Sequence, residues 1–386
     1  MKKVKLKDLG QIITGNTPKT SDDLNYISND ICFVKPSDIK DGTITYLADS
    51  EFYISEYARS KARILPPKSI LVTCIGIIGK IAINNIECSF NQQINAIIPN
   101  DNCLTEYLAY ALQSKQMELR DIANAPVVPI LNKTQFSEIE IYLPSFEEQK
   151  AIAERLDKVS GLIEKRKTQL EKLDLLIKSR FIEMFGEVGT NIKGWGFKRL
   201  GDCCTINPKK GEDKRLHQEL IVSFVPMPAV SEKGEIDASE KKSYDEVKTG
   251  FTYFAEQDVL FAKITPCMEN GKGAVAKGLC NGIGFGSTEF HVLRPIKGVS
   301  NPYWLYTVTA FKQFRMDAAS NMTGSAGQRR VPASFLDAYK VSLPPIELQH
   351  KFATFVEQVD KSKFEIQKSL EKLEILKKSL MQQYFG

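Results

Sequence analysis

The sequence predicts an α+β fold in which two pseudo-repeated globular domains are joined by two long helices packed as an antiparallel coiled coil. Three observations support this prediction. Residues 143–186 align without a gap on residues 343–386, and each of these segments shows a heptad pattern. The rest of the chain contains short β-branched runs bounded by Gly, Asn or Pro. With 386 residues, the chain is long enough for two or three domains of about 100–200 residues each.

The repeat extends over the whole chain. Within the helical segments the offset is 200 throughout, and it includes an LP-x-x-E-x-Q entry, an LEKL run and a final Phe-Gly. In the globular parts we expect an offset of 191, which places Lys7, Leu9, Gly10, Thr14, Asn16, Phe33 and Val34 on Lys198, Leu200, Gly201, Thr205, Asn207, Phe224 and Val225. One residue further out of step, at an offset of 192, Gly79-Lys80 matches Gly271-Lys272. The chain is therefore a duplicated unit of globular domain followed by helix.

Each long helix has an apolar seam whose members alternate by four and three residues. The predicted seam residues are Ile152, Leu156, Val159, Ile163, Leu170, Leu173 and Ile177 in the first helix, and Phe352, Val356, Val359, Ile366, Leu370, Leu373 and Leu380 in the second. Arg166, Arg180, Lys363 and Lys377 interrupt these seams. About 40 residues at 1.5 Å each give helices about 60 Å long. An antiparallel pair would place the globular domains at opposite ends, an arrangement that suits a partner which itself repeats.

The helix ends and the globular elements are predicted from local signals. Ser145 with Glu148 resembles a capping box, and Gly186 and Gly386 are helix stops. We expect two globular domains, residues 1–142 and 187–342, each followed by a repeated helix, residues 143–186 and 343–386. The predicted strands include 69–73, 80–84, 95–98, 258–262 and 290–293, and the main helices are 105–122 and 302–318.

Motifs of catalysis and metal binding are missing. GIIGK at residues 76–80 has two residues where a phosphate-binding loop needs four, so it predicts a hairpin turn. NPYW at residues 301–304 reads as a helix start, since no Gly-rich cofactor loop accompanies it. The eight cysteines form no CxxC pair, which favours free thiols over a metal site. We expect no catalytic residue, no metal and no bound cofactor. Without a signal peptide or a long apolar run, we expect a cytoplasmic protein that does not enter the membrane.

Nucleic-acid binding fits the loop chemistry better, and the net charge of +5 agrees with an acidic partner. Arg bonds guanine edges, Gln and Asn bond adenine edges, and Ser, Thr and Lys suit phosphates. The candidate residues are Lys80, Asn91, Gln92, Gln93, Asn132, Lys133, Lys209, Lys210, Lys272, Thr323, Ser325, Gln328, Arg329 and Arg330. Solvated loops without a ligand are the alternative interpretation of the same residues.

Two other functions stay open on these residues. A self-sufficient metal-dependent DNA nuclease would use the cluster of Asp237, Glu246 and Lys248. A coiled-coil scaffold that does not bind DNA would use the helices alone for assembly.

The order of motifs resembles the specificity subunit of type I restriction-modification systems. The match rests on the two LP-x-x-E-x-Q helix entries, SILVTCIGIIGKIAI at 69–83, VPILNK at 128–133 and TGSAGQRRVP at 323–332. The resemblance implies two target-recognition domains, each reading half of a bipartite site in double-stranded DNA, with the helix pair setting the half-site spacing. It also implies docking of two DNA methyltransferase subunits and the joining of translocase-nuclease subunits. S-adenosylmethionine, ATP and magnesium would then be bound by those partners, and this chain would be a non-catalytic subunit.

Overall fold

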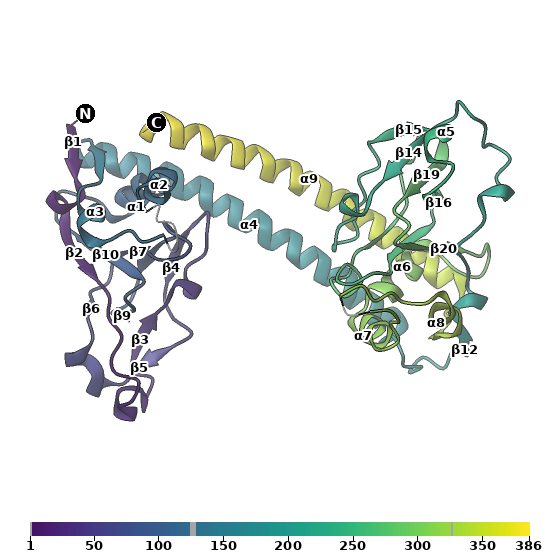
Figure 1. Cartoon of the computed structure of the whole chain (residues 1–386), viewed down its shortest axis with the longest axis horizontal. Helices are drawn as coiled ribbons and strands as arrows, with labels where there is room; N and C mark the ends of the chain where they lie inside the picture. Colours follow the sequence, from purple (N-terminus) through teal and green to yellow (C-terminus); the bar gives the residue numbers. More distant parts are fainter. Residues whose placement is uncertain (1, 124–128, 326) are drawn as a thin grey trace. The chain divides into compact units, whose positions relative to one another are not determined.

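The computed structural model describes residues 2–123, 129–325 and 327–386 and divides into two compact units. The first unit comprises Met1–Lys167 and Lys368–Gly386, and the second comprises Thr168–Gln367. Each unit therefore holds one globular part and half of each long helix, α4 (Phe146–Phe185) and α9 (Ile346–Phe385) (Figure 1). Within the described ranges, no helix is long and apolar enough to cross a membrane.

The long helices run antiparallel within each unit, as predicted. In the first unit, Arg155 donates a hydrogen bond to the Tyr384 hydroxyl at 2.9 Å, and Lys167 pairs with Glu374 at 3.9 Å. In the second unit, Lys363 bonds Asp174 at 2.6 Å. Along these contacts the residue numbers of α4 increase while those of α9 decrease, so the two helices are antiparallel. The buried seam positions are Ile152, Leu156, Val159, Ile163, Phe352, Val356, Val359 and Leu370. The other predicted seam positions, Leu170, Leu173, Ile177, Ile366, Leu373 and Leu380, are half-buried.

The repeated glutamine of the helix entries has a structural role that the motif alone did not explain. Gln149 is buried, accepts a hydrogen bond from the Leu104 N–H at 2.8 Å and donates to the Pro144 carbonyl at 3.1 Å. Gln349 makes the equivalent bonds to the Asn301 N–H at 2.8 Å and the Pro344 carbonyl at 2.9 Å. Each amide thus joins a long helix to the start of a domain helix. The Ser145–Glu148 capping box and the helix end at Gly186 are also confirmed.

The described residues of the first globular part form three sheets. A five-stranded sheet has the order β2 (Gly10–Thr14), β10 (Ile94–Pro99), β7 (Ile70–Thr73), β8 (Ile81–Asn84) and β4 (Ile44–Leu47). A four-stranded sheet has the order β5 (Tyr53–Ile54), β3 (Ile31–Val34), β9 (Cys88–Phe90) and β6 (Ile64–Leu65). β1 (Lys2–Lys5) pairs with β11 (Glu140–Leu143), and three helices complete this part, namely α1 (Thr105–Ser114), α2 (Gln116–Ile122) and α3 (Lys133–Ser137).

The second globular part repeats this plan. One sheet has the order β13 (Cys204–Ile206), β20 (Phe290–Pro295), β17 (Val259–Ala262) and β18 (Gly273–Val275). The other has the order β15 (Lys241–Ser243), β14 (Ile221–Val225), β19 (Ile283–Gly286) and β16 (Thr252–Ala255), and β12 (Phe197–Arg199) pairs with β21 (Lys340–Ser342). Its helices are α5 (Tyr244–Val247), α6 (Pro302–Ala310), α7 (Lys312–Ser320) and α8 (Ala333–Ala338). In both parts one strand pair of the second sheet is parallel, β3 with β9 and β14 with β19.

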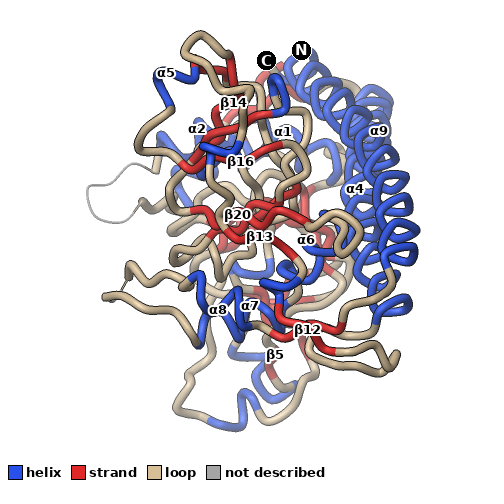
Figure 2. The backbone as a smooth tube through the Cα atoms, turned by 90° about the vertical axis from the view of Figure 1, so that its right-hand side faces the viewer, coloured by secondary structure: helices blue, strands red, loops and turns tan. Residues whose placement is uncertain are grey.

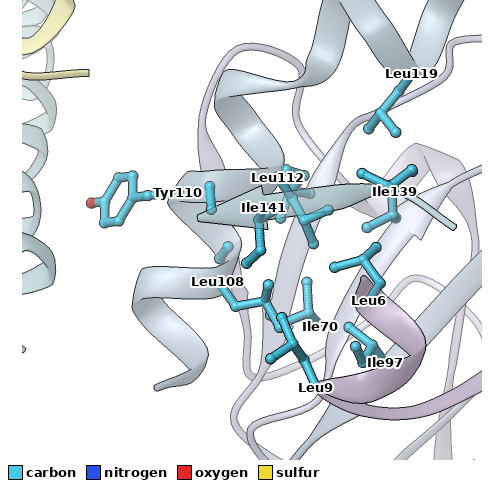
Figure 3. Packing of buried hydrophobic residues seen from close by; sticks show 14 of the residues in the cluster. Leu6, Leu9, Ile70, Ile97, Leu108, Tyr110, Leu112, Leu119, Ile139 and Ile141 are labelled. Carbon is cyan, nitrogen blue, oxygen red and sulfur yellow. The ribbon is translucent and has the colours of Figure 1, made fainter. Parts of the chain in front are cut away.

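A hydrophobic core lies between the sheet and the helices of each part. In the first, side chains such as Leu6, Ile70, Leu108 and Ile141 meet from strands, helices and the N-terminal segment (Figure 3). The strands and loops of the globular parts contrast with the continuous helical stretches of α4 and α9 in Figure 2. The predicted α+β class and two-fold repeat are therefore confirmed.

Two details of the prediction are wrong. The expected single helices 105–122 and 302–318 are each broken into two, at Lys115 and Phe311. Neither break contains Gly or Pro, so local propensity gave no signal. At Phe311 the reason is packing, because its ring lies 4.9 Å from that of Phe181.

The offset of 191 also fails near the N-terminus of each repeat. The Leu6 N–H donates to Ile139 O, as the Leu200 N–H donates to Tyr339 O, so Leu200 is equivalent to Leu6 and not to Leu9. The offset there is 200 − 6 = 194. A recurring Leu-Gly pair caused the misalignment, since both leucines of the first repeat are buried. At Val34 and Val225, in the parallel-paired strands β3 and β14, the offset is 225 − 34 = 191, whereas their strand partners Phe90 and Gly286 differ by 286 − 90 = 196.

Candidate nucleic-acid interface

Three segments that are distant in sequence meet beside the β7–β8 hairpin of the first unit. The Cys74 N–H donates to Gln93 O at 2.8 Å, and the Leu131 N–H donates to Cys74 O at 2.9 Å. We call residues 74–80, 91–93 and 129–133 the first loop edge. The GIIGK string forms the turn of this hairpin, as predicted, and the predicted residues Lys80, Gln93 and Asn132 all fall within the edge.

The second unit contains the same arrangement of backbone. The Lys263 N–H donates to Glu289 O at 2.9 Å, and the Val331 N–H donates to Lys263 O at 2.9 Å. The Thr265 N–H further bonds Arg329 O at 3.0 Å. We call residues 263–272, 287–289, 323–325 and 327–331 the second loop edge. Both edges thus share one pattern of hydrogen bonds although their side chains differ.

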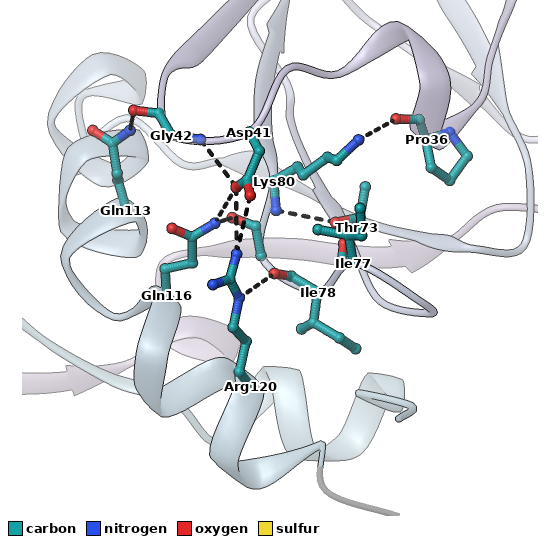
Figure 4. Close-up of polar contacts among 11 residues, drawn as sticks. Pro36, Asp41, Gly42, Thr73, Ile77, Ile78, Lys80, Gln113, Gln116 and Arg120 are labelled. Carbon is teal, nitrogen blue, oxygen red and sulfur yellow. Dashed lines mark hydrogen bonds and ion pairs between the residues drawn. The ribbon is translucent and has the colours of Figure 1, made fainter. Parts of the chain in front are cut away.

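Several predicted residues of the first edge are used within the fold. Lys80 donates to Pro36 O at 3.1 Å (Figure 4). Asn91 is buried and donates to Gln93 at 3.0 Å. Asn132 caps α3 by accepting from the Gln135 N–H at 2.9 Å. Gln92 and Lys133 are exposed, and Gln92 accepts a hydrogen bond from the Thr17 hydroxyl at 2.6 Å. The exposed predicted groups here are therefore Gln92, Asn132 and Lys133, of which Asn132 also caps α3.

Predicted residues of the second edge divide in the same way. Lys272 donates to Met227 O at 3.4 Å, the contact that corresponds to Lys80 with Pro36. Arg330 forms a bidentate pair with Glu289 at 2.8 and 2.9 Å, which raises the pKa of its guanidinium. Arg329 is 46% exposed, with Glu269 at 3.8 Å. Three further predicted residues, Thr323, Ser325 and Gln328, are exposed.

Lys209 and Lys210 lie outside the second loop edge, in the loop that follows β13. Lys209 is exposed, whereas the Lys210 ammonium donates to the Lys248 carbonyl. Val128, the first residue of the VPILNK motif, falls outside the described residues.

Sequence reasoning missed polar residues that the fold brings to these edges. Lys263 makes the same backbone hydrogen bonds in the second unit as Cys74 makes in the first. An offset of 191 pairs Cys74 with Thr265 instead, so the repeat alignment does not point to Lys263. In the first unit, Arg63 is exposed and its N–H donates to Asn16 Oδ1 at 2.8 Å, next to the Thr17 that bonds Gln92. No local sequence signal connects Arg63 with the hairpin, because the link is made through tertiary hydrogen bonds.

The acidic cluster proposed for a nuclease is occupied by local contacts. Glu246 accepts from the Ser243 N–H and hydroxyl at 2.8 and 2.7 Å, and Lys248 bonds Asp245 at 2.6 Å. Asp237 accepts from the Ser239 N–H at 3.0 Å. In the part of the chain that the structure describes, no group of three or more His, Cys, Asp or Glu side chains is placed to hold a metal ion.

Known proteins are similar to parts of this chain in sequence and to the whole chain in fold. The chain is 43% identical over 155 residues to the Type I restriction enzyme EcoEI specificity subunit of Escherichia coli, covering 40% of this chain and 25% of that protein. It is 35% identical over 230 residues to the MjaIX specificity subunit of Methanocaldococcus jannaschii, covering 55% and 53%. The aligned part of the chain thus spans about a quarter to a half of these relatives.

Solved structures show the same fold over the full length. The type I restriction-modification S subunit from M. genitalium aligns with a TM-score of 0.58 at 14% identity, covering 100% of this chain and 96% of that one. The sequence model of the "Type I restriction modification DNA specificity domain" matches residues 1–173 and 192–377. Because these two matches take in most of the 386 residues and fall on the two structural repeats, the chain belongs to the family of type I restriction-modification DNA specificity domains.

Proposed function

We propose that this chain is the DNA-specificity subunit of a type I restriction-modification complex, in which each globular part reads one half of a bipartite duplex site. The observation that supports this most is the recurrence of the loop edge. One hydrogen-bonded backbone frame is present in both units, but the accessible side chains upon it are different. A shared frame with variable side chains suits two readers of two different half-sites.

The side chains of the edges suit base and phosphate recognition. The first edge offers the Gln92 amide and the Lys133 ammonium, with Arg63 nearby. The second offers Arg329, Gln328, Lys263 and small hydroxyl side chains. Arg bonds guanine through two donors, Gln bonds adenine in the major groove, and Lys and Ser contact phosphates. Buried Asn91 and the Arg330–Glu289 pair hold these groups in place.

We infer that two copies of one methyltransferase subunit dock on the long helices. Leu175 and Ile375 occupy the same repeat position and are 63% and 69% exposed. The next residues, Leu176 and Leu376, are exposed as well. Large apolar side chains exposed at equivalent places favour two identical protein contacts, one on each helix. Translocase-nuclease subunits would join this assembly on double-stranded DNA.

The chain itself is proposed to be non-catalytic and cytoplasmic. S-adenosylmethionine, ATP and magnesium would be bound by the partner subunits, which supply methyl transfer, translocation and cleavage. The nuclease alternative has no supporting observation, because Asp237, Glu246 and Lys248 are each engaged in local contacts.

Exchange of one globular part tests this function. Residues 1–142 would be replaced by the matching domain of a relative and expressed with methyltransferase subunits. Sequencing of methylated bases should show one half-site changed and the other unaltered. As a matched control, exchange of residues 187–342 should change only the other half. A change of both halves in either exchange, or loss of all sequence preference with normal assembly, would contradict independent reading by the two units.

A further inference from the structure

A cavity of about 400 Å³ lies within the second unit, beside the β17–β18 loop. Its walls come from α6, the start of α7, that loop and the adjoining segments of α4 and α9. The volume falls in the range of small-molecule sites, about 300–1,000 Å³. Apolar side chains such as Ile177, Val275 and Val356 form part of the lining, together with the rings of Tyr303 and Tyr306.

A buried arginine reaches this cavity without a carboxylate partner. Arg315 is 6% exposed and donates to three backbone carbonyls, Thr309 O at 2.6 Å, Met268 O at 3.0 Å and Gly271 O at 3.3 Å. In the described part of the chain, no carboxylate forms an ion pair with it. Burial lowers the pKa of its guanidinium to about 10, as expected for a cation whose charge is not balanced.

The first repeat provides an internal comparison. Arg120 of α2 holds the β7–β8 loop through Ile78 O at 3.2 Å, as Arg315 of α7 holds the β17–β18 loop. However, Arg120 also pairs with Asp41 at 3.3 Å (Figure 4). The residue that corresponds to Asp41 at the offset of 191 is Glu232, which lines the cavity and is exposed. In the described residues, Arg315 thus makes the same kind of loop contact as Arg120 but has no carboxylate in an ion pair with it.

Charged side chains of both signs line the cavity, and the basic ones are in excess: Lys178, Lys233, Lys277, Lys312, Lys363 and Arg315 against Asp174, Glu232, Glu269 and Asp360. Lys277 is neutralised by Asp360 at 3.0 Å, and Lys363 by Asp174 at 2.6 Å. Lys312, next to Arg315 on α7, is exposed, and no ion pair of it is present in the described ranges. The Tyr306 hydroxyl similarly makes no hydrogen bond with the described residues, although burial raises the pKa of that phenol to about 12.

We propose that this cavity binds the phosphoryl group of a small molecule, inorganic phosphate or a mononucleotide, with Arg315 and Lys312 as its cations and the Tyr306 hydroxyl as a further donor. Two unpaired cations match a dianion, and a guanidinium offers the paired donors that phosphate oxygens accept. The apolar and aromatic walls have room for an organic group attached to the phosphate. A duplex backbone is a poor candidate, since a guanidinium that is 6% exposed is out of its reach. This inference does not depend on the proposed reading of DNA.

Calorimetric titration of the full chain with inorganic phosphate, AMP and adenosine tests the proposal. We expect phosphate and AMP to bind with one site per chain and adenosine not to bind. Tighter binding of AMP would assign a nucleotide, and equal binding would assign free phosphate. Arg315→Gln should weaken binding by at least about tenfold, as expected for the loss of hydrogen bonds to a charged group. The matched variant Arg120→Gln should bind as the wild type does.

Because Arg315 also holds the loop through Met268 O and Gly271 O, its replacement removes structural contacts as well, so two further variants keep the test decisive. Lys312→Gln and Tyr306→Phe should remain folded by circular dichroism and bind phosphate several-fold more weakly. Lys115→Gln, at the matching start of α2, serves as the control for Lys312. Absence of binding by the wild type would overturn the proposal. The same holds if all variants bind equally or if a non-specific DNA duplex displaces the ligand.

Discussion

Two neighbouring arginines of the second loop edge, Arg329 and Arg330, differ in how strongly they are paired with carboxylates. Arg330 is held by Glu289 in a bidentate pair, whereas Arg329 is half-exposed and only 3.8 Å from Glu269. We therefore expect Arg329→Ala to weaken binding of the assembled complex to its cognate site by about 1–3 kcal/mol, as for a base contact. Arg330→Ala should instead weaken binding to all duplexes by removing support from the loop. Titrations with cognate and scrambled duplexes check both, and a uniform loss for Arg329→Ala would make it a phosphate contact.

The paired glutamines at the helix entries set the geometry of each domain. Gln149 and Gln349 are buried, and replacing either by Ala leaves backbone groups without partners. Each substitution should lower the free energy of unfolding by about 1–3 kcal/mol. Urea unfolding followed by circular dichroism measures the change. Gln383→Ala, at an exposed position of α9, is the control and should change stability little. An equal effect at all three positions would contradict a specific role for the buried amides.

His291 links the β20 strand to the second loop edge. Its Nε2 lies 2.8 Å from Val331 O and its Nδ1 lies 3.0 Å from Asn207 Nδ2, so a neutral ring satisfies both partners. Burial lowers the pKa of the imidazole, an effect that nearby Lys263 increases and Glu289 opposes. Protonation of His291 therefore favours the unfolded chain. The stability that the neutral ring contributes to the folded chain is fully present above about pH 6.5 and is lost as the pH falls below that value.

Unfolding midpoints between pH 5 and pH 8 test this role. His291→Gln should be less stable than the wild type at pH 8 and show a shallower loss of stability between pH 7 and pH 5. His217→Gln, at an exposed histidine, should keep the wild-type slope. If His291→Gln keeps that slope too, other groups account for the pH dependence.

At the scale of elements, the α4–α9 pair contains a lysine in a seam position. The Lys363 side chain is 16% exposed and bonds Asp174 at 2.6 Å, whereas the repeat-equivalent residue of the other helix is Ile163. Asp174→Ala would leave a half-buried ammonium unpaired and should destabilise the chain by about 1–3 kcal/mol, less than for a fully buried pair, because the two side chains are 16% and 30% exposed. Lys363→Ile, alone or together with Asp174→Ala, should be neutral or stabilising. Urea unfolding of the three variants checks this order, and a destabilised Lys363→Ile would show that the ion pair itself stabilises the helices.

At the scale of the whole molecule, α4 and α9 are continuous helices that each contribute to both units. If they set the half-site spacing, their length is the relevant variable. Four residues inserted after Lys167 and four after Gln367 add about one helical turn, 5.4 Å or slightly more, and keep the facing of each segment. Both positions lie away from the aromatic contacts of Phe181 and Phe185 with Phe352, which an insertion near the C-terminal end of α4 would disturb.

We expect the four-residue insertions to retain both half-sites and to lengthen the spacer by one or two base pairs, since one pair advances about 3.4 Å. Two-residue insertions rotate each segment by about half a turn and should abolish activity. Sequencing of methylated bases gives the spacing directly. Activity at sites with the original spacing would show that partner subunits, and not the helices, set the distance.

The repeat, the long helices and most strands could be predicted from the sequence, because they follow from periodic apolar patterns and local turn residues. The sequence also determined the family resemblance, through motifs whose order recurs. Which loops meet, where the domain helices break and which polar groups are exposed could not be predicted, because these features depend on contacts between distant segments. Lys80 and Lys272 illustrate the difference, since both are loop lysines in sequence and both donate to backbone carbonyls in the fold. A short-range sequence pattern cannot encode the partner of a side chain when that partner lies many residues away. Arg120 and Arg315 show the consequence, since Arg120 pairs with the carboxylate of Asp41 whereas Arg315 donates to backbone carbonyls.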